Sequence, residues 1–432
     1  MCNAEGAMRL KTLVAVLGVG AVVACAPVQS GPTNTSTDEK TGQLRVWLFD
    51  EVNRGPKEAV VKEAISEFQG KHNGVTVDVQ YIQVSSRAER FKAAFSDPKS
   101  APDVAEFGNT DLAGYVSAGG FSELDLNGWS ESKDLVPTIL DTAKVDGKTY
   151  GVPWFVGVRA LYYRTDVFAE LGLKPPATLD EIAPLARQIR QRKPELIGIS
   201  AGGKYLFAAL PFIWANGGEI AKQDGGKFTA TIDSAEAKAG VAKYAELIKD
   251  DICPPATCAG NGGDASVEAF RAGKAAMTIG GDFNRKSVDA SSAAGKYAVV
   301  PLPGKTAGSI APAFAGGNLL GVMKGTQRKT LANEFVQLLA SKKYQQKMYT
   351  AMGNLPTFSD VQKQVSDSDK FLEPFTKTLQ SGTKFVPVTP AWAKIEAQTV
   401  LPTMIQEVVT GAKNVDAAAA SAAQTMNAAF AS

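Results

Sequence analysis

The sequence predicts an α/β protein with two domains, and three observations support this prediction. From residue 44 onward, apolar segments of strand length alternate with segments whose apolar residues recur at helical spacing, which is typical of layered α/β domains. The alternation is interrupted between residues 150 and 163, as expected at a change of domain. Residues 25–432 are also more than a single hydrophobic core usually accommodates.

The first domain begins with a predicted βαβ unit. Residues 44–49 form a continuous apolar run of strand length, and residues 60–68 place apolar side chains on one helical face before Gly70 ends the helix. In residues 75–81, Val and Tyr alternate with polar residues, which indicates a second strand. A helix that connects two strands predicts parallel pairing with a right-handed crossover.

The remaining elements are predicted by the same criteria. Residues 151–155 break the alternation, and Pro-Leu-Pro-Gly at 301–304 is interpreted as a linker. Beyond the linker we expect helices, except near residues 319–323. The other predicted strands cover residues 104–107, 160–163, 197–200 and 275–279, and the other predicted helices cover residues 87–95, 179–191 and 235–250.

A cationic, an apolar and a polar segment follow one another before the first predicted strand. The apolar run, residues 13–24, is well short of the roughly 20 residues that span a bilayer, so a cleaved secretory signal is favoured over an uncleaved anchor. The join at Cys25 resembles the lipobox of bacterial lipoproteins, which implies lipidation of this cysteine. We therefore predict a signal peptide over residues 1–24, a flexible tether over residues 25–43, and a lipid-anchored location on the extracellular face of the cytoplasmic membrane.

The composition argues against a nucleic-acid partner. The chain has 46 Lys and Arg residues against 44 Asp and Glu residues, so it offers no strongly positive surface to a phosphate backbone. It contains a single histidine, His72, and so has few of the ligands that transition metals prefer. We expect a monomer without a metal or another cofactor.

Two cysteines, Cys253 and Cys258, lie within the part predicted to be exported. They flank a short Pro-Pro-Ala-Thr turn, and outside the cell such a pair favours a disulfide. The alternative is a metal site, which needs further Cys or His ligands; His72 is far away in the sequence.

Several turn-like stretches at the ends of predicted strands are rich in aromatic residues and in Asn, Asp or Gly. Ligands of open α/β sheets bind outside the carboxyl ends of the strands. An aromatic platform with amide and carboxylate partners suits a sugar, which has an apolar face and a rim of hydroxyl groups. The candidates found in this way are Asp50, Asn109, Asp111, Trp154, Trp214, Asp282, Gly317, Asn318 and Trp392.

Arg159 is a single cation in an apolar segment. Two interpretations are open: the side chain braces a hinge through a buried ion pair, or it contacts a ligand.

An ordered set of short motifs covers residues 44 to about 425. The motifs are Pro-Asp-Val at 102–104, Gly-Asn-Thr at 108–110, Asp-Gly-Lys-Thr-Tyr-Gly-Val-Pro-Trp at 146–154, Leu-Tyr-Tyr-Arg-Thr-Asp-Val-Phe at 161–168, Pro-Ala-Thr-Leu-Asp-Glu-Ile at 176–182, Phe-Arg-Ala-Gly-Lys-Ala-Ala-Met-Thr-Ile at 270–279, Ala-Phe-Ala-Gly-Gly at 313–317, Asn-Leu-Pro at 354–356, and Trp392. The set resembles the extracellular solute-binding proteins of bacterial ABC importers, in the large carbohydrate-binding class that includes maltose-binding protein.

This resemblance implies a type II periplasmic-binding-protein fold. Two α/β lobes, each a mainly parallel sheet flanked by helices, are joined by a hinge with several crossings. The implied lobes are residues 44–150 plus 305–341 and residues 151–304 plus 342–432. A di- or oligosaccharide would bind with high affinity in the cleft between them, and the closed protein would deliver it to the permease subunits of the importer.

The resemblance also assigns the cleft residues. It adds Tyr205 to the candidates above, and Arg159 is kept as a further candidate. At Phe283 the sequence departs from the family, which often has a Trp there; the departure puts one stacking platform in doubt.

The sequence leaves three alternative functions open. The same fold could bind a polyamine, a peptide or another non-sugar solute, and acidic residues beside aromatic rings partly fit a polyamine. A secreted glycoside hydrolase needs two facing carboxylates, but no motif selects such a pair, and no phosphate-loop motif is present. An adhesin or surface scaffold, the third alternative, would not need its two lobes to close around a ligand. We therefore expect a binding protein and not an enzyme.

Overall fold

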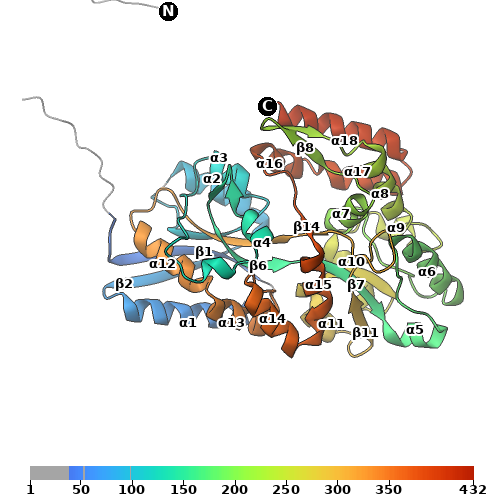
Figure 1. The fold of residues 1–432 in the computed structure, drawn as a ribbon, viewed down its shortest axis with the longest axis horizontal. Helices are drawn as coiled ribbons and strands as arrows, with labels where there is room; N and C mark the ends of the chain where they lie inside the picture. The colour runs from blue at the N-terminus through green and yellow to red at the C-terminus, as the bar shows by residue number, and fades with distance from the viewer. Residues whose placement is uncertain (1–37, 52–53, 98) are drawn as a thin grey trace, which may run out of the picture. The chain divides into compact units, whose positions relative to one another are not determined.

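The computed structural model describes residues 38–51, 54–97 and 99–432 (Figure 1). The predicted signal peptide, Cys25 and residues 26–37 of the predicted tether lie outside the described residues. Residues 38–432 form one compact unit.

A five-stranded sheet has the strand order β2-β1-β3-β13-β6. β1 pairs in parallel with both β2 and β3, and α1 connects β1 to β2, so the predicted βαβ unit is confirmed. β13 runs antiparallel to both of its neighbours. The strands are β1 (Gly42–Phe49), β2 (Val75–Ile82), β3 (Val104–Gly108), β6 (Val152–Gly157) and β13 (Gly316–Val322).

β6 corrects the prediction that residues 151–155 interrupt the pattern. The segment is a strand at the edge of the sheet. Pro153 obscured it, because proline cannot donate to a strand ladder and is tolerated mainly on edge strands. The edge position therefore explains why a strand can form where the sequence suggested a break.

A second sheet has the order β10-β7-β11, with β7 (Arg159–Arg164), β10 (Met277–Gly281) and β11 (Tyr297–Val300). Both of its ladders are antiparallel, whereas a mainly parallel sheet was expected. The predicted strand at 197–200 contributes only isolated parallel bridges to the β10 side. Hydrophobic runs indicate which segments are buried but not the direction of each strand, since long connections permit either parallel or antiparallel pairing.

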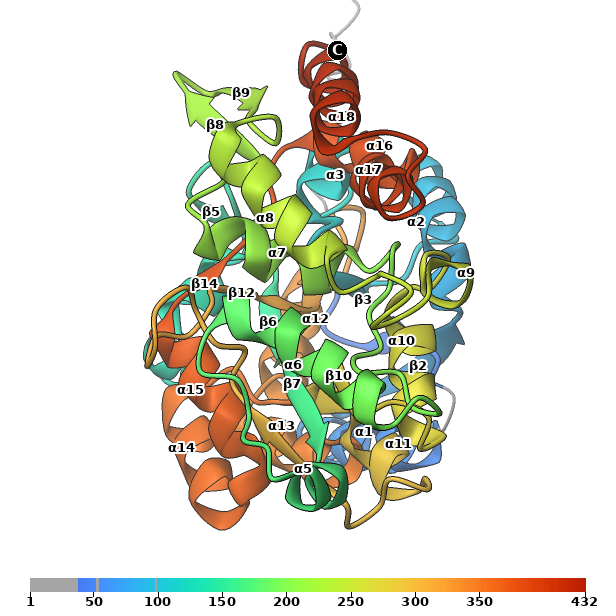
Figure 2. The ribbon, with the colours of Figure 1, turned by 90° about the vertical axis from the view of Figure 1, so that its right-hand side faces the viewer.

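Helices pack on both sheets, and α16, α17 and α18 pack together near the C-terminus (Figure 2). The predicted helix at 235–250 ends earlier, at Ala245. The helices are α1 (Gly55–Lys71), α2 (Arg87–Ser96), α3 (Leu112–Ser117), α4 (Pro137–Asp141), α5 (Thr165–Leu171), α6 (Leu179–Arg192), α7 (Leu206–Ala215), α8 (Ala235–Ala245), α9 (Pro255–Cys258), α10 (Gly263–Arg271), α11 (Arg285–Asp289), α12 (Lys329–Leu339), α13 (Lys342–Met352), α14 (Ser359–Ser368), α15 (Glu373–Ser381), α16 (Pro390–Ala397), α17 (Val400–Val409) and α18 (Val415–Phe430).

Short strand pairs complete the fold. One of them, β12 with β14, lies where the chain returns from the second sheet to the first. β6 and β7 belong to different sheets and are separated only by Val158. β12 and β14 pair in parallel. The short strands are β4 (Lys144–Val145), β5 (Lys148–Thr149), β8 (Ala221–Asp224), β9 (Lys227–Ala230), β12 (Ala313–Phe314) and β14 (Thr383–Lys384).

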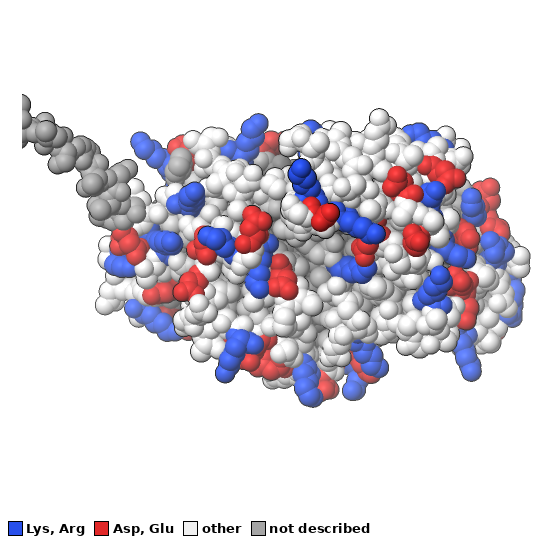
Figure 3. Space-filling view, turned by 45° about the horizontal axis from the view of Figure 1, so that its top comes forward, with Lys and Arg blue, Asp and Glu red and all other residues white. Residues whose placement is uncertain are grey.

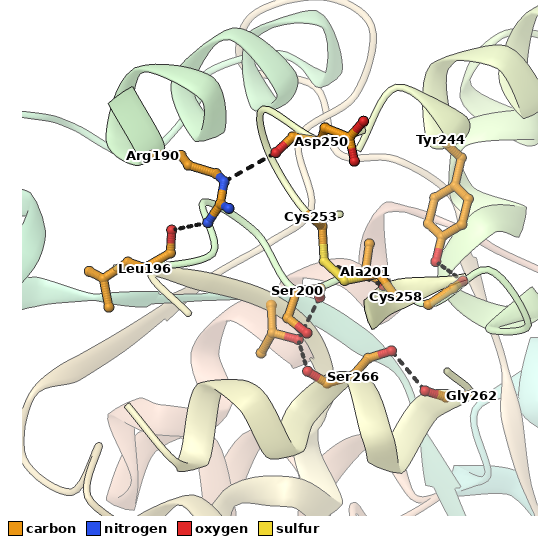
Figure 4. The surroundings of a disulfide bond; sticks show 12 residues. Arg190, Leu196, Ser200, Ala201, Tyr244, Asp250, Cys253, Cys258, Gly262 and Ser266 are labelled. Atoms are coloured by element: carbon orange, nitrogen blue, oxygen red, sulfur yellow. Dashed lines mark hydrogen bonds between the residues drawn. A yellow bond between two sulfur atoms is a disulfide. The ribbon is translucent and has the colours of Figure 1, made fainter. Parts of the chain in front are cut away.

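The sulfur atoms of Cys253 and Cys258 are bonded to each other, and both residues are fully buried (Figure 4). The turn that they close packs on the loop before α7, where the Gly203 N–H donates to the Cys258 carbonyl at 3.0 Å. A Cβ on Gly203 would lie 2.4 Å from the Ala259 carbonyl oxygen, so only glycine fits this approach. The disulfide therefore pins a turn that supports the start of α7.

Charges of both signs are interspersed over the face shown in Figure 3. In the described part of the chain, no helix combines the length and apolar character needed to cross a bilayer.

Candidate ligand-binding site

The described part of the chain contains a cavity of about 330 Å³ whose wall is mostly apolar and aromatic, with a few charged groups. Its size and lining are typical of a small-molecule site. The lining residues are Arg159, Lys204, Tyr205, Leu206, Phe207, Gly263, Asp264, Phe283, Asn284, Trp392, Ile395, Glu396, Leu401 and Pro402.

First-turn residues of four helices belong to the wall of this cavity. Leu206 begins α7, Gly263 begins α10, Trp392 lies in the first turn of α16, and Leu401 lies in the first turn of α17. No side chain caps α7, α10 or α16. Because the first N–H groups of a helix lack intrahelical partners and carry partial positive charge, the wall offers donors to a ligand.

Arg159, the first residue of β7, lines the cavity. Its Nε donates to the Tyr205 hydroxyl at 3.3 Å. Its guanidinium lies over the rings of Phe207, Phe283 and Phe314 at 5.1, 5.4 and 5.9 Å from the ring centroids. Within the residues described, it forms no ion pair, so the interpretation as a hinge-bracing pair finds no support.

α16 places two side chains on the cavity wall. Trp392 and Glu396 are four residues apart and therefore share a helical face. Trp392 is 2% exposed, and its indole N–H has no acceptor among the described residues. Burial and the nearby Asp111 raise the pKa of Glu396, while Arg87 acts in the opposite direction.

Asp111 lies beside α16 and not in the cavity wall. Its carboxylate accepts from Arg87 Nε at 2.9 Å. α3, which follows Asp111, packs against α16, and a Cβ on Gly114 would lie 3.3 Å from that of Ala393. Asp111 therefore lies where α3, which follows β3 of the first sheet, meets α16, the helix that carries Trp392 and Glu396.

Two predicted residues, Trp154 and Asn318, belong to a buried polar cluster in the first sheet. The Lys57 ammonium lies 3.0 Å from Glu106 Oε2 and 5.2 Å from the Trp154 ring centroid. Glu106 also accepts from the Phe49 N–H at 2.7 Å and from Asn318 Nδ2 at 2.6 Å. Because each oxygen of the buried carboxylate has a donor, the charge is compensated. None of these residues lines the cavity.

Asp282 lies where the chain crosses between the two sheets. It is 2% exposed, and its Oδ1 accepts from the Val158 N–H at 2.9 Å. Oδ2 has no partner among the described residues. Burial raises the pKa of Asp282 to about 7, partly opposed by the backbone N–H of Val158. The side chain therefore ties the crossing residue to the end of β10.

The remaining predicted residues lie outside the cavity wall. Asp50 follows the last residue of β1 and accepts from Gln83 Nε2 at 2.9 Å. Asn109 Nδ2 donates to the Ala315 carbonyl at 2.9 Å, and the Asn109 N–H donates to the Gly317 carbonyl. A Cβ on Gly317 would lie 2.3 Å from the Phe155 carbonyl oxygen, so this position requires glycine. Trp214 is packed in the hydrophobic core around α7 and α8.

The structure thus brings three predicted residues, Arg159, Tyr205 and Trp392, to one cavity. Sequence reasoning did not select Phe207 or Glu396. Glu396 had a usable signal, because it follows Trp392 by one helical turn. Phe283 was noted only as a departure from the family pattern, yet it lines the cavity and is 42% exposed.

The chain belongs to the bacterial extracellular solute-binding protein family, whose model matches residues 63–374. It is 26% identical to the diacetylchitobiose binding protein DasA of Streptomyces coelicolor, over 94% of this chain and 96% of that protein. It is 25% identical to the galactooligosaccharide-binding protein of Bacillus subtilis, over 82% of this chain and 84% of that protein.

Solved structures agree with this assignment. The sugar-binding protein MalE from Xanthomonas citri aligns with a TM-score of 0.78 and 24% identity, over 90% of this chain and 98% of that one. The GacH receptor of Streptomyces glaucescens aligns with a TM-score of 0.76 and 21% identity, over 90% and 99%. The predicted type II periplasmic-binding-protein fold is confirmed by these similarities.

Proposed function

We propose that this protein binds a di- or oligosaccharide outside the cytoplasmic membrane and delivers it to the permease of an ABC importer. The observation that carries the proposal is the cavity, in which aromatic rings stand beside polar groups in a solute-binding fold. Such a wall suits a sugar, because rings cover its apolar face while polar groups meet its hydroxyls. The names of the relatives, which include diacetylchitobiose, lactose and galactooligosaccharide binders, support the same class of ligand.

Delivery would depend on closure of two lobes. We propose the lobes of the sequence prediction, with the first crossing placed at Val158 because β6 belongs to the first sheet. The contact of α3 with α16 joins the first lobe to the helix of the second that lines the cavity. All residues that line the cavity lie in the proposed second lobe. The ligand would therefore favour the closed state only by also reaching the first lobe, because only a ligand that contacts both lobes can shift the equilibrium.

Binding without catalysis fits the charges of the cavity. Its two carboxyl groups differ in environment, since Asp264 is exposed and Glu396 is half-buried. A binding site accounts for both carboxyl groups without a catalytic role for either. The wall gives no specific support to a polycationic ligand, because Arg159 and Lys204 stand beside Asp264 and Glu396.

Calorimetric titration of the full chain tests the proposal. The panel consists of di- to penta-saccharides from starch, cellulose, xylan, chitin and galactan, with spermidine as the polyamine. We expect one-to-one binding of at least one saccharide and recovery of that saccharide unchanged. Binding of spermidine alone, or release of shorter sugars during incubation, would contradict the proposal.

A further inference from the structure

Arg159 differs from the other half-buried arginines of the described residues. Those arginines pair with carboxylates or donate from a terminal nitrogen to backbone carbonyls. In residues 38–51, 54–97 and 99–432, the two terminal nitrogens of Arg159 have no hydrogen bond and no ion pair, and only Nε is used. Guanidinium donors point outward in the plane of the group, so its contacts with three aromatic rings leave the terminal donors without a partner among the described residues and free for a ligand.

None of the described carboxylates forms an ion pair with this cation, although burial raises the pKa of the nearby Asp282 and the charge of Arg159 partly lowers it again. Asp282, the nearest buried carboxyl, points to Val158, and its pKa of about 7 leaves it only partly ionised at neutral pH. Glu396 lines the same wall, and burial and Asp111 raise its pKa. Lys204 and Asp264 are exposed and offset one another at the rim. The wall therefore carries two cationic and two carboxyl side chains, and within the described residues Arg159 is paired with neither of these carboxyls.

The helix ends add partial positive charge to this wall. α7 and α10 both begin at the cavity, and neither has a side-chain cap. The first turns of α16 and α17 also belong to the wall. The partial positive charge at such ends favours an anion, and the buried indole N–H of Trp392 is a further donor without an acceptor among the described residues.

We propose, on the basis of the sugar-binding function proposed above, that the ligand is an acidic saccharide whose uronic-acid carboxylate pairs with Arg159. A carboxylate is planar and matches the fork of the guanidinium with two parallel hydrogen bonds. The ring of Phe283, which is 42% exposed, remains for the apolar face of the sugar. A neutral sugar would leave a partly desolvated guanidinium without a counter-charge, which is costly.

The test compares saccharides that differ only in the acid group. Cellobiose is titrated against cellobiouronic acid, and α-1,4-galactobiose against α-1,4-digalacturonic acid, by calorimetry on the full chain. Diacetylchitobiose is included, because an acetamido carbonyl is the alternative acceptor for Arg159. We expect at least one acid to bind about tenfold or more tightly than its neutral partner, with an affinity that falls as salt is added.

Two variants assign the effect to this side chain. Arg159→Gln should remove the preference for the acid, and Arg159→Lys should retain part of it, since the charge stays but the planar fork is lost. Arg90→Gln is the matched control, because Arg90 is exposed and lies over Trp47 outside the cavity. The wild-type comparison remains decisive if Arg159→Gln fails to fold.

The outcomes separate this proposal from the function on which it rests. Equal or tighter binding of the neutral partners, or tighter binding of diacetylchitobiose than of either acid, overturns the acidic ligand and leaves sugar binding intact. A preference for the acid that survives in folded Arg159→Gln overturns the role of Arg159. Absence of binding by every saccharide overturns both proposals.

Discussion

Trp392 and Trp214 show how burial alone fails to separate a site residue from a core residue. Both are almost fully buried, at 2% and 4% exposure, and both stand near turn residues in the sequence. Trp392 lines the cavity, whereas Trp214 is packed among the apolar residues of α7 and α8. The two residues therefore form a matched pair for mutation.

We predict that Trp392→Phe weakens saccharide binding about tenfold, because the variant loses ring area and the indole donor. Trp214→Phe should leave the affinity within about twofold, since that side chain does not reach the cavity. Calorimetric titration of both variants, with thermal unfolding as a check on folding, makes the comparison. A larger loss of affinity in Trp214→Phe would contradict the assignment.

Asp282 makes stability depend on pH. Its pKa is about 7 in the folded protein and about 4 when unfolded, so the folded state holds the proton more tightly. The contribution of Asp282 to the free energy of unfolding should therefore be largest below pH 4 and fall as the pH rises to 7, by at most roughly 4 kcal/mol.

The variant Asp282→Asn tests this effect, because the amide keeps an acceptor for the Val158 N–H and cannot ionise. We predict that its stability relative to wild type is greater at pH 8 than at pH 5, measured by urea unfolding. Asp78→Asn, at an exposed position on β2, is the control and should show no such change. An equal difference at both pH values would contradict the prediction.

At the scale of elements, Lys57 and Glu106 join α1 to β3 through a fully buried ion pair. Trp154 on β6 and Asn318 on β13 contact the same pair, so one charge cluster links four elements. The sequence offered no sign of it, because Lys57 falls within an ordinary amphipathic helix pattern and Glu106 within an apolar strand.

We predict that Lys57→Met lowers the free energy of unfolding by about 3–5 kcal/mol, because it leaves Glu106 buried without its counter-charge. The double variant Lys57→Met/Glu106→Gln should recover much of the loss. Lys148→Met, in an exposed pair with Glu123, is the control and should change stability little. Urea unfolding of the four proteins measures this, and a double variant less stable than Lys57→Met would contradict it.

Element prediction succeeded where local pattern and burial agree. α1, β1 and β2 follow the predicted segments closely, because a helix with one apolar face and two apolar strands leave few alternatives. It failed at β6, where Pro153 hides an edge strand. It also failed for the direction of the strands in the second sheet, which depends on partners distant in the sequence.

At the scale of the whole molecule, the proposed lipid anchor decides where the ligand is captured. We predict that Cys25→Ala releases the protein from the membrane fraction of an expressing bacterium and abolishes its labelling by radioactive palmitate. Cys2→Ala, which lies outside the predicted lipobox, should leave both unchanged. Retention of Cys25→Ala in the membrane with labelling intact would contradict lipidation at this residue.

The sequence by itself determined the family, the order of most helices and strands, and a set of candidate residues at strand ends. Those conclusions depend on local composition and on motifs that follow one another along the chain. Only the tertiary structure decided that Arg159, Tyr205 and Trp392 share a cavity with Phe283 and Glu396. These residues come from segments far apart in the sequence, and their meeting depends on how α7, α10, α16 and α17 pack around the end of β7. Such long-range packing sets which donors remain unpaired, and for this reason the unsatisfied guanidinium of Arg159 could not be recognised before the fold was known.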